Sequence, residues 1–174
     1  MRIRSAAPSD AALLPAFILQ EGANPWNWLP EDGVRQTAAQ LASGEVAGVV
    51  LEAEGELLGV MLYCRADHYP AYRPSSIPPE QAAYVIEAVV SRRLAGQGWG
   101  SRLLLAACAR LAEEGARWVC ADRHEENAGS AGMMRKAGFA VLGAFEDERR
   151  NHGSRRTAVC GRYLDPASVT TACS

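Results

Sequence analysis

Three glycines at alternate positions, Gly96, Gly98 and Gly100, mark the segment of this chain best suited to holding a ligand. They lie in a short basic turn between an apolar run that ends at Val90 and a leucine-rich helical pattern. Glycine lets the backbone approach a ligand closely because it has no Cβ. The first turn of a helix adds free N–H groups and the positive end of its dipole. The arrangement predicts an anion site, suited to a pyrophosphate, at the start of that helix.

Two carboxylates near this turn are candidates for accepting a proton. Glu87 lies within the apolar run 84–90, and Asp122 ends a later apolar strand. Strand alternation decides which of them faces a ligand, and a bulge in the strand would reverse the answer. We favour Glu87, because an acid inside an otherwise apolar run needs a reason. The alternative is an edge glutamate that faces solvent.

The composition is that of a soluble globular protein. The 174 residues include 48% hydrophobic and 22% charged side chains, with a net charge of −2, which argues against a nonspecific nucleic-acid binder. No apolar stretch reaches the ~18 residues of a membrane span, and the first ten residues lack the apolar core of a signal peptide. We therefore expect a cytoplasmic protein that binds neither nucleic acid nor membrane.

The cysteines and the chain length indicate the redox state of the thiols and the number of domains. Five cysteines are scattered without a C-x-x-C pair, and the three histidines are dispersed. This spacing favours reduced thiols over a disulfide framework and gives no metal site. The length is that of one domain, which we place at residues 1–164. The small and polar residues 165–174 are expected to form a flexible tail.

Short strands and helices alternate along the predicted domain. Strands are expected at residues 2–5, 46–52, 56–65, 83–90, 117–122, 139–145 and 157–164, and helices from Pro8 through Ile18 and at 31–42, 98–114 and 127–137. A proline-rich loop, 68–79, and a charged loop, 146–156, connect them. The mixture of hairpins and crossovers implies an α/β (α+β) fold, with a mixed, mostly antiparallel twisted sheet of six or seven strands and helices on both faces.

The glycine turn, in this order of elements, resembles that of the GCN5-related N-acetyltransferase (GNAT) superfamily, and the resemblance covers about residues 2–164. The family's acyl-CoA pyrophosphate turn reads (Arg or Gln)-x-x-Gly-x-(Gly or Ala). Here it is residues 95–100, Ala-Gly-Gln-Gly-Trp-Gly, with Ala95 in place of the leading Arg or Gln. Arg92 or Arg93 is a candidate to supply the missing charge.

A second motif strengthens the resemblance. The family pattern Asn-x-x-Ala-x-x-Leu-Tyr-x-Lys-x-Gly-Phe is matched at Asn127, Lys136, Gly138 and Phe139, and Met134 stands at the tyrosine position. The opening Ile-Arg-x-Ala-x-Pro-x-Asp of residues 3–10 is also similar to the family's usual start. A dinucleotide fingerprint fits less well, because the third glycine comes one residue early and hairpin strands precede the turn.

The resemblance implies direct transfer of an acetyl group from acetyl-CoA, the expected cofactor, to an amine in a ternary complex. It implies that backbone N–H groups of the turn hold the pyrophosphate. It also implies that the splayed strand before the turn binds the pantetheine arm and the thioester oxygen. The residues expected to bind the cofactor are Ala88, Val89, Val90, Ala95, Gly96, Gln97, Gly98, Trp99, Gly100, Ser101, Asn127 and Ser130.

The resemblance further implies a general base and an acid for the departing thiolate. Glu87 and Asp122 remain the two candidates for the base. In many members of the family a tyrosine protonates the thiolate, at the position that Met134 occupies here. We therefore expect Tyr84, a hydroxyl of the proline-rich loop (Tyr69 or Tyr72), or water to take that role.

The predicted function is an N-acetyltransferase acting on a small-molecule or peptide amine. The alternative, which Ala95 and Met134 favour, is a GNAT-fold protein that binds acyl-CoA without turnover, as a sensor or structural partner. The acceptor site is expected beside the loops that carry Trp26 with Trp28 and Tyr69 with Tyr72, where residues 146–148 could attract a cation. Exposed edge strands are compatible with a homodimer.

Overall fold

The computed structural model describes residues 1–165, so the expected tail lies outside the described residues except for Asp165. Seven strands and four α-helices alternate along the chain. The strands are β1 (Arg2–Ser5), β2 (Ala47–Ala53), β3 (Glu56–Cys64), β4 (Ala82–Val90), β5 (Trp118–His124), β6 (Ala140–Glu146) and β7 (Arg156–Tyr163). The helices are α1 (Leu14–Glu21), α2 (Glu31–Ser43), α3 (Trp99–Glu113) and α4 (Ala128–Lys136).

Each predicted strand and helix is present in the structure, although some of their bounds and one helix differ from the prediction. The helix expected from Pro8 is divided into a 3₁₀ turn, Pro8–Ala12, and α1, which restarts with Pro15 in its first turn. Proline has no N–H to continue the hydrogen bonds of the preceding turn but fits the first positions of a new helix. The proline-rich loop contains two further 3₁₀ turns, Pro70–Tyr72 and Pro79–Gln81.

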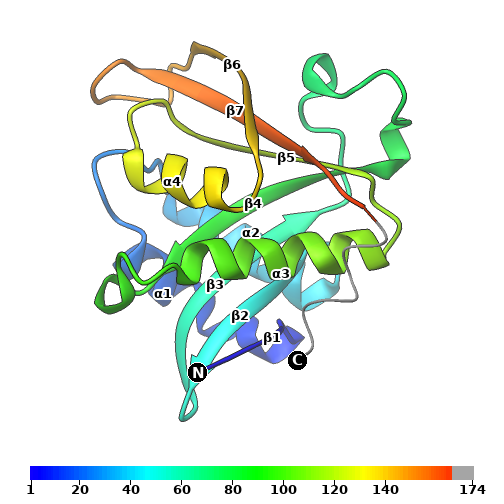
Figure 1. Ribbon diagram of the computed structural model, residues 1–174. Coiled ribbons are helices and arrows are strands. Elements are labelled where there is room, and N and C mark those ends of the chain that lie inside the picture. Colours follow the sequence, from blue (N-terminus) through cyan, green and yellow to red (C-terminus); the bar gives the residue numbers. More distant parts are fainter. Residues whose placement is uncertain (166–174) are drawn as a thin grey trace.

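The seven strands form one sheet in the order β1-β2-β3-β4-β5-β7-β6. Every neighbouring pair is antiparallel except β4 and β5, which are parallel. Helices α3 and α4 cover one face of the sheet, and α1 and α2 cover the other (Figure 1). The expected mixed, mostly antiparallel sheet with helices on both faces is therefore confirmed.

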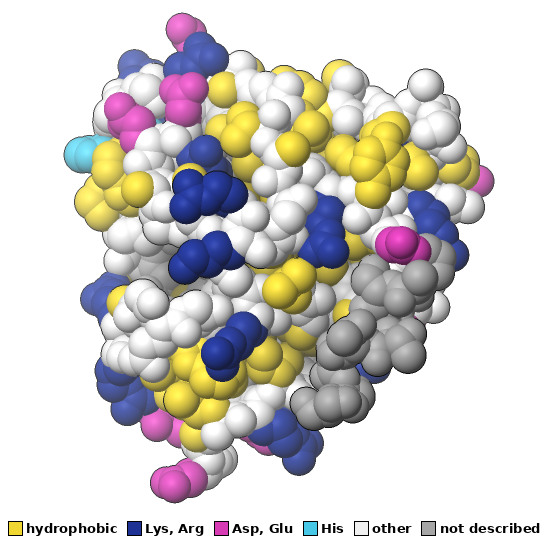
Figure 2. All heavy atoms as spheres, viewed as in Figure 1, with side chains coloured by type: hydrophobic (Ala, Val, Ile, Leu, Met, Phe, Trp, Pro, Cys, Tyr) yellow, Lys and Arg dark blue, Asp and Glu magenta, His cyan; other side chains and the backbone are white. Residues whose placement is uncertain are grey.

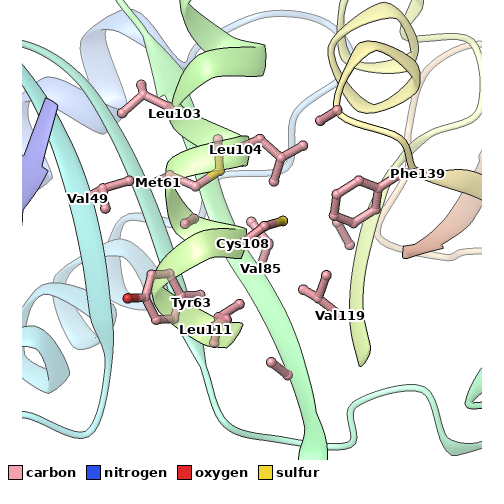
Figure 3. Close-up of a cluster of buried hydrophobic side chains, with 14 of the residues drawn as sticks. Val49, Met61, Tyr63, Val85, Leu103, Leu104, Cys108, Leu111, Val119 and Phe139 are labelled. Atoms are coloured by element: carbon pink, nitrogen blue, oxygen red, sulfur yellow. The ribbon is translucent and has the colours of Figure 1, made fainter. Parts of the chain in front are cut away.

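Each face of the sheet has its own hydrophobic core. On one face α3 packs Leu103, Leu104 and Leu111 against the sheet; Figure 3 shows these side chains among those of the strands and Phe139. On the other face α1 and α2 pack Ile18 and Val34 against β2 and β3. We call these the α3 core and the α1–α2 core.

The parallel pair β4–β5 is short. Only Ala82, Ala83 and Tyr84 of β4 pair with β5, opposite Trp118, Val119 and Cys120. Beyond Tyr84 the two strands separate, although β4 continues to pair with β3 and β5 continues to pair with β7. The sheet is thus forked, and one edge of β4 has no strand beside it over residues 85–90.

A β-bulge in β4 changes which side chains face into the fork. Opposite β3, Tyr63 pairs with Val85 and Leu62 pairs with Glu87, so Ile86 is an extra residue. Val85, before the bulge, packs in the α3 core, whereas Val89, after it, packs in the α1–α2 core. Glu87, two residues from Val89, is therefore turned away from the α3 core, where unbroken alternation from Val85 would have placed it.

No helix among residues 1–165 is both long and apolar enough to cross a membrane. Within the same residues, no three His, Cys, Asp or Glu side chains lie close enough together to hold a metal ion. The four cysteines that the structure describes are free thiols.

Replacing Gly161 of β7 with alanine is expected to destabilise the fold. A Cβ at Gly161 would lie 2.4 Å from Trp118 Cζ2 and 2.8 Å from Leu142 Cδ1, and overpacking of this kind costs about 1–3 kcal/mol. Gly132→Ala, in α4, is the control: its Cβ would meet nothing within 4 Å, so it should stabilise by about 0.5–1 kcal/mol. Urea unfolding of both variants measures the difference, and equal effects would contradict this packing.

Candidate active site

The glycine turn leaves a set of backbone donors uncovered. Gly96 and Gly98 have φ angles of +76° and +81°, and a Cβ on either would meet nothing within 4 Å. Gly98 is the N-cap of α3, and no side chain caps that end. The N–H groups of the first helical turn, residues 99–101, have no acceptor within the helix. They sit at the positive end of the dipole of a 15-residue helix.

A cavity of about 520 Å³ lies against these donors, between the turn, the end of β4 and the start of α4. Basic side chains lie over α4 and over the start of α3 on this face (Figure 2). Ten of the twelve residues expected to bind a cofactor line the cavity: Ala88, Val90, Ala95, Gly96, Gly98, Trp99, Gly100, Ser101, Asn127 and Ser130. The sequence had placed them on three separate elements.

Val89 and Gln97, the two other expected residues, do not line this cavity. Gln97 turns back to donate its side-chain amide to Arg93 O, at 3.2 Å. The Val89 side chain is buried in the α1–α2 core. Ser91 donates its N–H to Leu58 O of β3. By alternation Val89 N–H also points to β3, and the N–H groups of Ala88 and Val90 point into the fork.

The arginines considered as substitutes at Ala95 are engaged elsewhere. Arg92 donates its guanidinium to the carbonyl oxygens of Gln20 and Ala23, at the end of α1, and Arg93 donates to Glu56 at 2.5 Å. Arg92 still lines the cavity despite these bonds, and so does Lys136, the last residue of α4. It is the single lysine among 18 basic residues, a signal that the sequence offered and that we had assigned only to a motif match.

Helix α4 is held against the start of α3 by close contacts. Asn127 caps α4 by accepting the N–H of Ser130, at 3.0 Å. Ser101 donates its hydroxyl to Met133 O, at 3.2 Å, and a Cβ at Gly100 would lie only 2.9 Å from Met133 Sδ. Gly100 therefore lets the two helices approach, which differs from the role of the positive-φ glycines beside it.

A second cavity, of about 280 Å³, passes through the fork between β4 and β5. Val34 of α2 and Leu104 of α3 both line it, so it reaches both faces of the sheet. Glu87 is on its wall, where the bulge has turned it. Burial, and in second place the charge of Asp122, raise the pKa of Glu87 to about 7. The two cavities adjoin, because Ala88, Ser130 and Met133 line both.

Asp122 lines the second cavity as well, and it accepts three hydrogen bonds from other side chains. Its Oδ2 accepts the hydroxyl protons of Tyr69 and Tyr84, each at 2.7 Å, and its Oδ1 accepts from Arg150 Nη2 at 3.3 Å. Burial, followed by the Asp122 charge, raises the pKa of both phenols well above the ordinary value. Both tyrosines are therefore protonated donors with their protons directed at Asp122.

Met134 occupies the inner wall of this cavity. It is 4% exposed and packs in the α3 core with Leu104 and Val85. No tyrosine hydroxyl stands at this position, as the sequence indicated. Tyr72, the other hydroxyl considered, packs over Gly143 of β6, with 2.8 Å between its ring and the position of a Cβ there.

Two loops meet over the end of β5. The ring of Trp26, before α2, lies 4.8 Å from those of His124 and His152. His124 is buried, accepts the N–H of Glu126 at Nδ1, and so donates from Nε2 to His152 O. Arg150 donates to Trp26 O at 3.1 Å. These contacts fix the segment before α2 to the β6–β7 loop.

The β6–β7 loop brings cations to the second cavity, whereas the sequence had suggested that its acids would face an acceptor. Arg149 and Arg150 line the cavity, and none of residues 146–148 does. Asp147 is buried, and its hydrogen bonds with Arg149, opposed in part by burial, hold its pKa well below the ordinary value. Thr157 also donates to this carboxylate, at 2.6 Å.

Comparison with known proteins identifies this architecture. Residues 14–139 match the model of the acetyltransferase (GNAT) family. No curated protein sequence matches. A GNAT acetyltransferase from Streptococcus pneumoniae superposes with a TM-score of 0.71 at 17% identity, over 94% of this chain and 99% of that one.

Two further solved structures are similar. The ribosomal-protein-alanine N-acetyltransferase of Brucella melitensis has a TM-score of 0.72 at 19% identity, over 94% of this chain and all of that one. A putative acetyltransferase from Salmonella typhimurium, solved with its cofactor acetyl-CoA, has a TM-score of 0.73 at 18% identity, over 95% of this chain and 94% of that one. At these low identities, the superpositions show a shared fold and nothing more. With the family match over residues 14–139, they show that the chain belongs to the GNAT acetyltransferase family.

Proposed function

We propose that this protein, as a single domain over residues 1–164, transfers an acetyl group from acetyl-CoA to a primary amine, with Glu87 as the general base. The observation that carries the proposal is the position of Glu87. The bulge at Ile86 turns its carboxyl into a cavity that adjoins the one beside the glycine turn. A base in one cavity and anion donors in the next fit an amine and an acyl-CoA that meet between them.

The turn and the fork supply groups that fit acetyl-CoA. Three uncapped N–H groups at residues 99–101 suit a pyrophosphate. The unpaired edge of β4, at Ala88 and Val90, suits an extended arm that bonds like an added strand. When bound, acetyl-CoA supplies the thioester that the amine attacks. A free N–H on the same edge is the donor we assign to the carbonyl oxygen as its charge develops.

Glu87 offsets the cost of deprotonating the amine. An alkyl ammonium with a pKa near 10.4 costs about 4–5 kcal/mol to deprotonate at pH 7. A carboxyl whose pKa is about 7 is half-ionised at neutral pH and is a stronger base than an ordinary glutamate. Asp122 is less suitable for this role, because two phenols and Arg150 already occupy its oxygens.

The hydrogen bonds around Asp122 also limit which group can protonate the departing thiolate. Tyr84 and Tyr69 direct their protons at Asp122, and Met134 has none to give. The amine nitrogen starts as an ammonium and gives up two protons. Glu87 takes the first and passes it to solvent, which leaves a neutral amine and an ionised carboxyl. As the C–N bond forms and the C–S bond breaks, Glu87 takes the second proton and passes it, directly or through water, to the departing thiolate, so the carboxyl is again ionised.

Binding of acyl-CoA without turnover is the second candidate, favoured by Ala95 and Met134, where the family pattern is interrupted. The two candidates differ in a simple measurement. Thermal stabilisation by CoA, together with no release of thiol from acetyl-CoA over a broad panel of amines, would select the binding protein.

Glu87→Gln is expected to lower kcat by about 10²–10⁴-fold, the usual contribution of a general base. In the wild type, kcat/KM should rise with pH and level off above about 7, because the carboxyl must lose its proton to act. The variant should lack this limb. Thiol release from acetyl-CoA measured from pH 5.5 to 9 tests both points. Glu80→Gln, an exposed site, is the control; a variant E87Q with the wild-type profile would remove Glu87 from the mechanism.

The raised pKa of Glu87 should also make the stability of the protein depend on pH, with stability falling over the range in which activity rises. The pKa of Glu87 is raised from 4.5 to about 7 in the fold, so the native state binds its proton more tightly than the unfolded chain does. The free energy of unfolding should therefore fall as pH rises from about 5 to 7, by up to about 1.4 kcal/mol per pH unit. Urea unfolding of wild type and Glu87→Gln across this range isolates the effect. Parallel pH curves would contradict it.

Gly98→Ala is expected to weaken the binding of CoA. Its methyl group would enter the space beside the uncapped N–H groups and strain a left-handed residue. Gly44→Ala is a matched control, since Gly44 has a φ of +84° against +81° for Gly98, and neither Cβ would meet an atom within 4 Å. Both variants should lose about 1–2 kcal/mol of stability. Only Gly98→Ala should lose the rise in Tm that CoA produces, and equal responses to CoA would place the cofactor elsewhere.

A further inference from the structure

We propose that the acceptor is a small amino carboxylate: a molecule with one amino group, which Glu87 deprotonates, and a carboxylate, which Arg149 binds at the mouth of the cavity. This inference rests on the proposed function and names its acceptor class. The structural basis is that one cavity is lined both by Glu87 and by Arg149, an arginine that is hydrogen-bonded to Asp147 and lies beside the Trp28 ring.

Among residues 1–165, the carboxylates around the cavity other than Glu87 already have partners in the protein. Asp122 accepts from two phenols and from Arg150. Asp147 accepts from the backbone N, Nε and Nη2 of Arg149 and from Thr157. Glu87 is the carboxyl without such bonds, and it is needed for the reacting amine. A polyamine or an aminoglycoside would place a further ammonium here without a counter-charge, which is costly in a partly buried site.

Arg149 is oriented to receive an anion. Asp147 binds the edge formed by Nε and Nη2, at 2.9 and 2.7 Å. Arg149 also interacts with the hydroxyl of Tyr69. The donors on Nη1 and Nη2 that Asp147 does not use are the ones we assign to a substrate carboxylate, beside that hydroxyl. The side chain is 44% exposed. Its guanidinium lies 5.6 Å from the centre of the Trp28 ring, which supports it from one side.

The charges balance for such a molecule during the reaction. Arg123, Arg149 and Arg150 line the cavity, with Asp122 on the wall and Asp147 behind Arg149. Once Glu87 has taken the proton of the amine, these groups carry one net positive charge. A substrate carboxylate neutralises that charge, whereas a second ammonium would add to it.

The size and lining of the cavity suit a small molecule with an apolar body. Its volume of about 280 Å³ is at the low end for ligand sites. Leu29, Val34 and Ile86 line it on the α2 side. The two loops over the end of β5 contact each other through Trp26, His152 and Arg150. They therefore cover the cavity, which suits a small molecule better than a folded protein.

Matched acceptors that differ only in the carboxylate test the proposal. We would compare phenylalanine with phenethylamine, leucine with 3-methylbutylamine, and add spermidine and a short peptide with a free N-terminus. Thiol release from acetyl-CoA gives kcat/KM for each. Each amino acid should exceed its decarboxylated partner by about tenfold or more, the worth of a charge-assisted hydrogen bond. Spermidine should be the poorest acceptor.

The variant Arg149→Gln tests whether Arg149 is the residue that causes the preference for amino acids. The ratio of kcat/KM between phenylalanine and phenethylamine should fall toward one in this variant, mainly through KM for the amino acid. Arg110→Gln, at an exposed ion pair on α3, is the control and should keep the wild-type ratio. The ratio in the wild type decides the question even if Arg149→Gln fails to fold.

Each outcome separates the acceptor class from the proposed function. If the enzyme turns over the decarboxylated amines, the peptide or spermidine better than the amino acids, the proposed acceptor class is wrong. The proposed acetyltransferase activity would then still hold. An unchanged ratio in Arg149→Gln would remove Arg149 from the site. Stabilisation by CoA with no turnover of any acceptor would overturn the proposed function, and the acceptor class with it.

Discussion

The short parallel contact between β4 and β5 is the constraint on which the rest of this structure depends. Three residue pairs join the strands before they separate. A buried backbone edge without a partner is unfavourable, so the open half of β4 needs a ligand, water or side chains beside it. The glycine turn and α4 border the same opening from the other side. The fork thereby unites an anion site, an unpaired strand edge and a polar cavity in one continuous space.

The bulge at Ile86 gives the fork its chemistry. Without it, the alternation that places Val85 in the α3 core would bury Glu87 there too, in apolar surroundings. With it, Glu87 faces a cavity that contains a second charge, Asp122, and the combination of burial and that charge sets its pKa near neutrality. One inserted residue therefore decides whether Glu87 is buried in an apolar core or faces the cavity, where the proposed function needs a base.

The sequence predicted what depends on local pattern, and missed what depends on distant contacts. Strand alternation, the glycine turn and the Asn127 cap are signals within a few residues, and each expected element appears within a few residues of its predicted bounds. The position of the bulge could not be predicted from the sequence, because the run around Glu87 is apolar on both faces of the sheet and shows no break in alternation. The bonds from Tyr69 and Arg150 to Asp122 join residues 53 and 28 positions apart. Arg92, whose charge suggested a phosphate contact, lines the cavity beside the glycine turn but gives its guanidinium to carbonyl oxygens at the end of α1, 69 and 72 positions away. Such pairings follow from the tertiary fold alone.

The network around Asp122 links the two halves of the site. Arg150 bonds Asp122 with one nitrogen, the hydroxyl of Thr157 with a second, and Trp26 O with a third. Asp122, whose charge contributes to the raised pKa of Glu87, is thus bonded to the same guanidinium that ties Trp26 to the β6–β7 loop. The two carboxylates of the cavity therefore differ in their partners: Asp122 accepts hydrogen bonds from Tyr69, Tyr84 and Arg150, whereas Glu87 is the one to which we assign the proton transfer. A change in the β6–β7 loop that displaced Arg150 would alter both the shape of the cavity and the surroundings of Asp122, whose charge contributes to the raised pKa of Glu87. Under the proposed function, one side chain therefore affects both the acceptor site and the base.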